Sequence, residues 1–433
     1  MENNDFWSPN NQKEHFPCVM EWWASIGFFK TIEDNKKWSF KGVLNQWCEK
    51  VDGIGSLLNF VIFDEQTGNY HEYFLKRKGV KLVSSKEDFK IKYDDSYIKG
   101  LYPDYEIYFN DKKNNIKLKI KNKALSKPYN VAQGITNGLL PMGTGILRYG
   151  FIPKNQLSGT MEINNKIYTI IGEGYYEHIW GDFWYDNPFA NILELRKTLS
   201  IYIKFFFWWL QNHKLKLPNS LIFSTENNPF GYDWAWAIFE NGWSLFYGNL
   251  MFFIMKGPAA GSLILTKDGK TYKEYGNIDF KYNKVKRSKN FDFVYPTEIE
   301  MNVIDKNEKL HLIFQMTSDS REYVADFEKS KNWLGFVICE APGIVNGYYD
   351  DGEEKIPLSG ICKIEPQRQV SKFGHNSLKI DFIKPPSGVG ISFNLESHYL
   401  KRKIRKEIIL SPFPKLKINI NKIKSNFEKK GKN

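Results

Sequence analysis

The segment from Gly172 to Asp182 concentrates side chains that can transfer protons. It reads Gly-Glu-Gly-Tyr-Tyr-Glu-His-Ile-Trp-Gly-Asp. Imidazole, carboxyl and phenol groups serve as general acids and bases, and an indole ring can face a positive charge. Any chemistry of this chain is therefore expected here. His178, Glu177 and Tyr176 are the candidate catalytic residues, and Trp180 is a candidate wall of the site.

Alternation along a strand would divide this segment between two environments. If Glu173 to Trp180 is extended, successive side chains point to opposite faces. One face then carries Tyr176, His178 and Trp180, and the other carries Tyr175, Glu177 and Ile179. A plainer interpretation stays open, because a strand histidine between aromatic residues can be a hydrogen-bonded structural residue that joins two domains.

The elements around this segment are predicted to be mostly β, because alternating apolar stretches are broken by short polar turns. Asn164-Asn165 forms the turn of the hairpin that leads into the segment. Similar turns are predicted at Gln66-Thr67-Gly68, Lys112-Lys113-Asn114, Asp268-Gly269 and Lys306-Asn307. They indicate large antiparallel sheets in both halves of the chain.

Residues 187–217 interrupt this pattern with helical spacing. The central part, Phe189 to Leu210, contains Glu194, Arg196, Lys197 and Lys204, and these charges argue against a transmembrane span. Two interpretations remain: a helix packed over the mouth of a barrel, or an interfacial helix whose Phe and Trp side chains enter a bilayer surface.

A chain of 433 residues exceeds what one hydrophobic core usually supports, so two domains are expected. We predict a first β domain at 15–186, a helical insertion at 187–230, a second β domain at 231–400 and a basic tail at 401–433. The high content of aromatic residues, 16%, is compatible with barrels lined by rings.

The formal charge of +12 is concentrated at the end of the chain. Residues 401–433 hold 12 Lys and Arg against 2 Glu, a net charge of +10, which leaves +2 for the rest. With no recognisable nucleic-acid-binding motif, no nucleic-acid partner is expected. The tail is interpreted as a solvated segment or as a contact for anionic lipids.

The cysteines and the first residues suggest a location. Cys18, Cys48, Cys339 and Cys362 are far apart and form no metal or redox motif. The sequence opens without a basic region followed by an apolar run, so no secretory signal is expected. We predict a cytoplasmic protein with peripheral membrane contact through Phe189 to Leu210 and the tail.

Three landmarks occur in order along the chain: Met20-Glu21-Trp22-Trp23, Gly174-Tyr175-Tyr176-Glu177-His178-Ile179-Trp180-Gly181 and Asp233-Trp234-Ala235-Trp236. The combination resembles the lipocalin-like superfamily of carotenoid hydratases (hydroxyneurosporene synthases) and AttH-type proteins, with tocopherol cyclases and fungal cyclases as more distant relatives. The segment Ile356 to Glu365 is similar to a late strand of that family. The resemblance spans roughly residues 18–370 and rests on these motifs.

This resemblance implies an all-β fold of two tandem lipocalin-like (calycin-type) antiparallel β-barrels with a helical insertion between them. It also implies an apolar ligand, such as an isoprenoid, polyene or lipid, bound in a barrel or between the barrels. Hydration, cyclisation or isomerisation of such a molecule through a carbocation needs a positioned acid, a dry cavity and nearby π faces. His178 would relay a proton, and no cofactor is implied.

The resemblance adds candidates from the second half of the chain. The resemblance implies that hydratase members use a tyrosine and an aspartate that follow the third landmark. The corresponding residues of this chain are Tyr247 and Asn249. An asparagine cannot donate a proton as a carboxylic acid can. Either the donor is then Glu177, Asp182 or Asp233, or the chain is not a hydratase. Asn249 stays a candidate ligand contact.

Further ligand-contacting candidates come from the landmarks themselves. They are Glu21, Trp22, Trp23, Trp234 and Trp236, although the tryptophans could equally be core packing and Glu21 a strand anchor. Glu173, His178 and Asp182 match no recognised metal spacing, so no metal site is expected. The alternative function is a non-catalytic lipid-binding or lipid-transfer protein at membrane surfaces.

Overall fold

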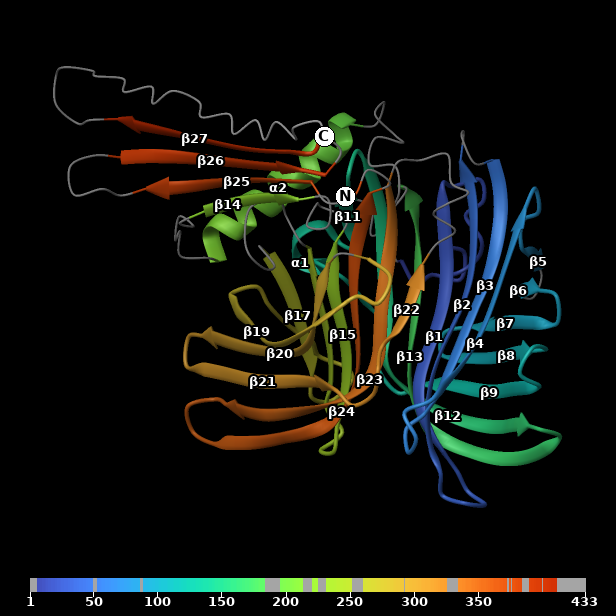
Figure 1. Ribbon diagram of the computed structural model, residues 1–433. Helices are drawn as coiled ribbons and strands as arrows, with labels where there is room; N and C mark the ends of the chain where they lie inside the picture. Colours follow the sequence, from blue (N-terminus) through green and yellow to red (C-terminus); the bar gives the residue numbers. More distant parts are fainter. Residues whose placement is uncertain are drawn as a thin grey trace.

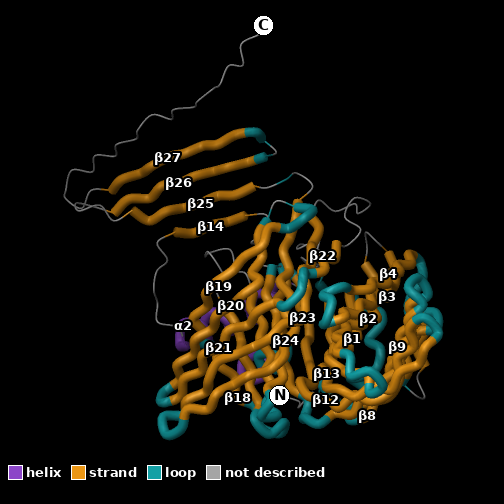
Figure 2. Tube along the Cα trace, turned by 60° about the horizontal axis from the view of Figure 1, so that its bottom comes forward, coloured by secondary structure: helices purple, strands orange, loops and turns teal. Residues whose placement is uncertain are grey.

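The computed structural model describes residues 6–49, 53–85, 89–183, 195–212, 220–224, 231–250, 260–291, 293–324, 334–371, 374, 376–383, 389–398 and 400–410. These residues form two large curled antiparallel sheets, a smaller third sheet and two helices (Figures 1 and 2). The all-β fold with two barrel-like units is therefore confirmed.

The first sheet runs in the order β4-β3-β2-β1-β13-β12-β9-β8-β7-β6-β5, with β10 and β11 paired to β12. It curls until β6 packs against β2 and β3. Its strands are β1 (Met20–Thr31), β2 (Lys37–Glu49), β3 (Gly53–Asp64), β4 (Tyr70–Lys78), β5 (Val83–Ser85), β6 (Lys90–Tyr93), β7 (Ser96–Leu101), β8 (Asp104–Asp111), β9 (Ile116–Ala124), β10 (Tyr129–Asn130), β11 (Leu139–Met142), β12 (Gly145–Ile163) and β13 (Lys166–Asp182).

The second sheet runs in the order β18-β17-β16-β15-β24-β23-β21-β20-β19, with β22 paired to β23. Its strands are β15 (Tyr232–Phe239), β16 (Ser244–Leu250), β17 (Ala260–Thr266), β18 (Lys273–Tyr275), β19 (Ile278–Arg287), β20 (Val294–Asp305), β21 (Glu308–Met316), β22 (Arg321–Val324), β23 (Leu334–Asp350) and β24 (Lys355–Ser371).

The third sheet combines segments that the sequence analysis assigned to three different regions. It consists of β14 (Ser220–Ser224), β25 (Asn376–Ile383), β26 (Val389–Ser397) and β27 (Arg402–Leu410) in that order. β14 comes from the predicted insertion, β25 and β26 from the predicted second barrel, and β27 from the predicted tail. The second curled sheet ends at Ser371, before the predicted boundary at residue 400, and 401–410 are not a free tail.

Two helices are described. α1 (Gln133–Thr136) is a single turn, and α2 (Leu195–Asn212) is the long one predicted within 187–217. The flanks of that prediction, including Phe189, lie outside the described residues. α2 packs on α1, β11 and the start of β12 (Figure 1). No described helix combines the length and the apolar character that a bilayer crossing requires.

The two curled sheets meet where β1, β12 and β13 face β15 and β16, and this contact explains why β13 and β15 are buried on both faces. Residues 174–180 of β13 are buried without interruption. One face of β13 packs inside the first barrel, while Tyr175 on the other face packs with Trp234, Trp236 and Phe246 at the junction. A strand covered on both sides loses the polar face expected of an exposed sheet.

All five predicted hairpins are present as antiparallel strand pairs. Asn164 and Asn165 join β12 to β13 with φ angles of 51° and 63°, as a two-residue turn with two left-handed residues requires. The Asp268-Gly269 turn differs from expectation, because Leu265 pairs with Lys273 and the connection is longer than two residues. The hairpin itself is confirmed.

Candidate functional site

Strand register brings the first two landmarks together inside the first barrel. In the β1–β13 pair, Trp23 lies opposite His178 and Glu21 lies opposite Trp180. Glu21 and His178 are therefore diagonal neighbours on one face, within reach of long side chains. β2 adds Gln46 directly opposite Glu21. The interleaved landmarks thus form one buried cluster, although 157 positions separate Glu21 from His178.

Glu21 is fully buried and is surrounded by hydrogen-bond donors. Its carboxylate accepts from His178 Nε2 at 3.0 Å, His15 Nδ1 at 2.9 Å and Gln46 Nε2 at 3.0 Å, and from the His15 backbone N–H at 3.0 Å. Burial by itself would raise the pKa of Glu21. The hydrogen bonds from the two histidines outweigh burial and lower the pKa to about 2. Glu21 is therefore ionised at neutral pH.

His178 is held as a neutral base. Only 1% of the residue is exposed, and burial lowers its pKa to about 4 against the opposing effect of Glu21. Because Glu21 can only accept, His178 Nε2 carries the hydrogen and Nδ1 keeps its lone pair. Among the described residues, Nδ1 has no hydrogen-bond partner. The pair thus resembles the carboxylate–imidazole arrangement in which the acid fixes the tautomer of the base.

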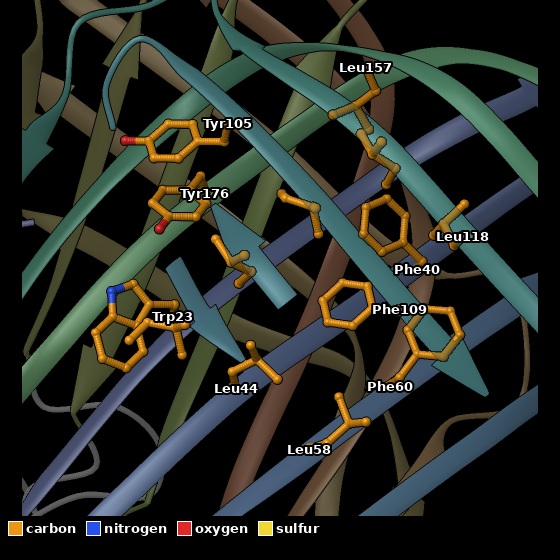
Figure 3. Close-up of a cluster of buried hydrophobic side chains, with 14 of the residues drawn as sticks. Trp23, Phe40, Leu44, Leu58, Phe60, Tyr105, Phe109, Leu118, Leu157 and Tyr176 are labelled. Carbon is orange, nitrogen blue, oxygen red and sulfur yellow. The ribbon is translucent and has the colours of Figure 1, made fainter. Parts of the chain in front are cut away.

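Aromatic rings enclose the His178 imidazole. Trp23 stacks on it with centroids 4.8 Å apart, Trp180 lies at 4.6 Å, and Phe6 approaches edge-on at 6.4 Å. Tyr176, two residues earlier, stacks on Tyr105 at 4.2 Å. In Figure 3, Trp23, Tyr176 and Tyr105 lie at one end of the buried cluster, and phenylalanine and leucine side chains fill the other end.

The N-terminal segment 6–18, called here the plug, covers this end of the barrel. Gly150 lies opposite His178 in the β12–β13 pair and leaves a hollow that the Phe6 ring fills, since a Cβ at Gly150 would lie 2.3 Å from that ring. The Gln12 side chain accepts hydrogen bonds from Tyr102 N at 2.7 Å and the Tyr105 hydroxyl at 3.0 Å. The His15 ring stacks on Trp180 at 3.9 Å.

Three side chains of the cluster are of types that can bind a metal ion: His15, Glu21 and His178. Each offers one ligand atom, and these three atoms lie within 4.8 Å of one another. This set differs from Glu173, His178 and Asp182, which match no metal spacing in the sequence. Both imidazoles already direct a nitrogen at the same carboxylate oxygen. A transition metal would have to replace these two hydrogen bonds and take up the nitrogen lone pairs.

Glu177 faces away from His178, as the alternation predicted. It accepts hydrogen bonds from Trp22 Nε1 at 3.0 Å, the Tyr149 hydroxyl at 2.6 Å and the Tyr175 hydroxyl at 2.9 Å. Trp234 Nε1 donates to the same Tyr149 hydroxyl at 3.0 Å. Glu177 therefore lies on the junction side of β13, on the face opposite to His178, and it is linked to Trp234 through the Tyr149 hydroxyl. Trp22 reaches Glu177 from a neighbouring cluster of the first barrel.

Asp233, Tyr247 and Asn249 lie together in the second barrel. Asp233 pairs with Arg368 at 2.8 Å and accepts from the Tyr282 hydroxyl, while Asn249 donates to Asp233 at 3.2 Å and to the Tyr247 hydroxyl. Tyr247 belongs to the core of that barrel. The structure therefore does not unite these residues with His178 in one site.

In the described part of the chain, the junction between the two barrels is packed with aromatic rings. Trp236, Phe28, Phe151 and Phe246 fill it, and Trp236 donates to the Pro153 carbonyl at 2.7 Å. A cleft of about 320 Å³ lies beside the junction. Of the segment 172–182, its lining includes Glu173, and it includes none of the predicted catalytic or ligand-binding residues. It is lined by Glu173, Ile238, Phe239, Glu240, Ile344, Asn346, Ser359, Gly360 and Ile361.

Sequence reasoning missed the residues that complete the cluster: Phe6, Gln12, His15, Gln46 and Gly150. Gln46 and Gly150 become neighbours of Glu21 and His178 only through register. Phe6, Gln12 and His15 belong to an irregular segment without periodicity. The proximity of His15 to the Glu-Trp-Trp landmark was the one available signal.

Comparisons with known proteins establish the fold. No family model and no curated protein matches the chain. A provisionally assigned AttH from Nitrosomonas europaea superposes with a TM-score of 0.55 at 14% identity, covering 82% of this chain and 95% of that one. Kievitone hydratase from Nectria haematococca gives 0.52 at 11% identity, covering 82% and 90%. This chain therefore has the two-barrel fold of these proteins, as its resemblance to the lipocalin-like superfamily predicted.

Proposed function

We propose that the protein is a cofactor-independent enzyme in which Glu21 and His178 move a proton on an apolar small molecule. The observation that carries the proposal is the buried carboxylate–imidazole pair, whose Nδ1 has no partner among the described residues and whose surroundings are aromatic. A neutral imidazole with an oriented tautomer is a general base. The shared fold with a hydratase supports the class of reaction.

The protonation states favour a reaction that begins with proton removal. His178 and Glu21 have pKa values of about 4 and 2, so neither is an acid at neutral pH. Burial keeps the Tyr176 phenol protonated by raising its pKa. His178 would take a proton from water or a substrate hydroxyl as its oxygen adds to a double bond polarised by a carbonyl group. The adjacent carbon then receives that proton back, which gives net hydration or cyclisation.

This route revises the carbocation chemistry that the resemblance implied. Protonation of an unactivated polyene needs a strong acid beside the alkene, and no described carboxyl group beside His178 can supply it at neutral pH. The proposed substrate is therefore an apolar, isoprenoid-like molecule with a conjugated carbonyl group. It would reach His178 by taking the place of the plug, because the deeper barrel interior is filled by side chains.

The test compares three variants with a panel of such substrates. We expect His178→Gln and Glu21→Gln to lower kcat by about 10²–10⁴-fold, the usual contribution of a general base. Glu177→Gln is the matched control, since it neutralises the neighbouring carboxylate on the opposite face of β13. Equal turnover in His178→Gln and the unmodified protein would overturn the proposal.

A second candidate is the non-catalytic lipid carrier, which the exposed apolar surface of α2 favours. Native mass spectrometry of the purified protein separates the two functions. A co-purified membrane lipid, together with no turnover of any carbonyl-conjugated substrate, would support the carrier. Turnover that is lost in both the Glu21 and the His178 variants would support the enzyme.

A further inference from the structure

α2 presents three distinct faces. The face against the body of the protein contains Ile201, which is buried, and Thr198, whose hydroxyl donates to the Thr144 carbonyl at 2.8 Å. The Tyr202 hydroxyl donates to the Gly143 carbonyl at 3.2 Å. Trp208 fits against Gly276, where a Cβ would lie 2.1 Å from the indole. These contacts fix which way the helix is turned.

A second face of α2 is apolar and open to solvent. Five apolar side chains on this face are each between 36% and 57% exposed: Leu195, Leu199, Ile203, Phe206 and Phe207. Their spacing of three, four and eight places them on one stripe along an α-helix. Monomeric proteins seldom expose a contiguous apolar stripe of this kind unless it meets another surface.

The third face of α2 is basic. Lys197 and Lys204 are exposed beside the apolar stripe, and Arg196 is exposed at the N-terminal end of the stripe itself. No Asp or Glu occurs between Leu195 and Asn212. An apolar stripe edged by basic residues is the pattern of helices that lie in the plane of an anionic membrane surface. A second copy of this helix would bring like charges together, so charge disfavours pairing of two α2 stripes.

We propose that α2 docks the protein on an anionic lipid bilayer, with its apolar stripe inserted between headgroups and its basic face against lipid phosphates or carboxylates. This surface is independent of the Glu21–His178 site. Docking would bring the first barrel near a source of apolar molecules, because Thr144 immediately precedes β12. Gly150 beside His178 follows six residues later, about 20 Å along the strand.

Vesicle flotation tests the proposal. The probes are vesicles of phosphatidylcholine alone and vesicles with roughly one-third phosphatidylserine. The full chain is expected to float with the anionic vesicles and to bind the neutral ones at least several-fold more weakly. We expect Ile203→Glu/Phe207→Glu to lower partitioning at least tenfold. Lys197→Gln/Lys204→Gln should reduce binding to anionic vesicles only.

Matched controls separate docking from general surface effects. Ile167→Glu/Ile304→Glu introduces the same charges at two exposed apolar positions on other elements and should float like the unmodified chain. His178→Gln should also float normally, so failure of the catalytic proposal stays distinguishable. The proposal would be overturned if the unmodified chain did not float, or if Ile203→Glu/Phe207→Glu floated as well as the unmodified chain. It would also be overturned if the chain formed a dimer in solution that Ile203→Glu/Phe207→Glu alone disrupted.

Discussion

At the scale of single residues, the chemistry depends on a competition that only burial can decide. A histidine beside a carboxylate usually gains a proton, because the opposite charge favours the imidazolium form. Here desolvation of His178 exceeds the attraction of Glu21, and the pKa falls to about 4. The same residue would act as an acid in a wetter site. Burial thus keeps the His178 imidazole uncharged at neutral pH.

The lowered pKa of His178 predicts loss of stability in acid. The unfolded chain binds this proton near pH 6.5 and the folded protein only near pH 4. Stability should therefore decline as the pH falls from about 6.5 to about 4, by up to about 3 kcal/mol. The pKa of Glu21, lowered to about 2 from 4.5, adds a further loss below pH 4.5.

Urea denaturation at several pH values measures this effect. His178→Gln lacks the titrating group, so its free energy of unfolding should change less than that of the unmodified protein between pH 7 and pH 4. A constant difference between the two proteins over that range would show that burial does not control this histidine.

At the scale of elements, the site depends on two antiparallel strands and on the plug that covers them. β1 and β13 supply Glu21 and His178 with a geometry fixed by register. Phe6, by contrast, is held in the hollow over Gly150 by packing. The plug therefore occupies a place that a flat apolar guest could take.

Gly150→Ala should open that place. The added methyl group collides with the Phe6 ring, so the plug must move, and Phe6→Ala removes the ring without a collision. We expect both variants to bind the apolar dye Nile red several-fold more tightly, measured by fluorescence titration. Gly134→Ala is the control, since a Cβ there meets no atom within 4 Å. Unchanged dye binding in both plug variants would contradict the role of the plug.

Sequence patterns predicted elements well where local chemistry was sufficient. The two faces of β13 followed from alternation, and the hairpin at Asn164-Asn165 followed from residues that tolerate positive φ. The third sheet could not be foreseen, because β14 pairs with β25 across more than 150 positions. No feature of the sequence of these strands indicates which strand each one pairs with. Long-range pairing is decided by the whole fold.

Candidate residues show the same limit. Glu21, His178, Trp23 and Trp180 were selected by motif, and the structure assembles them. Asp233, Tyr247 and Asn249 were selected by resemblance, and the structure puts them in the other barrel. A motif reveals which side chains are available, whereas the direction of each strand determines which of them meet.

At the scale of the whole molecule, buried charges help to join the two barrels. Arg321 of β22 reaches Glu340 at 2.5 Å in its own sheet, and Asn59 at 2.7 Å and Glu72 in the other sheet. Lys41 of β2 pairs with Glu365 of β24. The positive charges of Lys41 and Arg321 lower the pKa of Glu340 although burial opposes them. Each charge therefore depends on partners across the junction.

Removal of one partner from this network should be costly. Arg321→Met leaves Glu340 and Glu72 without their shared cation, and we expect a loss of about 3–5 kcal/mol in the free energy of unfolding, measured by denaturant titration. Arg77→Met is the control, because its ion pair with Asp94 is largely exposed and should contribute less than about 1 kcal/mol. Similar losses in both variants would argue against the junction network.

The double burial of β13 also has a mechanical consequence. Tyr176 and His178 border the space taken by the plug. On the opposite face of the same strand, Tyr175 packs against Trp234 and Trp236 of the second unit, and Glu177 accepts a hydrogen bond from the Tyr175 hydroxyl. A ligand that moves the β13 backbone by a fraction of an ångström would strain the close-packed junction on the opposite face of the strand. Occupancy of one compartment would thus be communicated to its neighbour through shared covalent bonds, without any hinge.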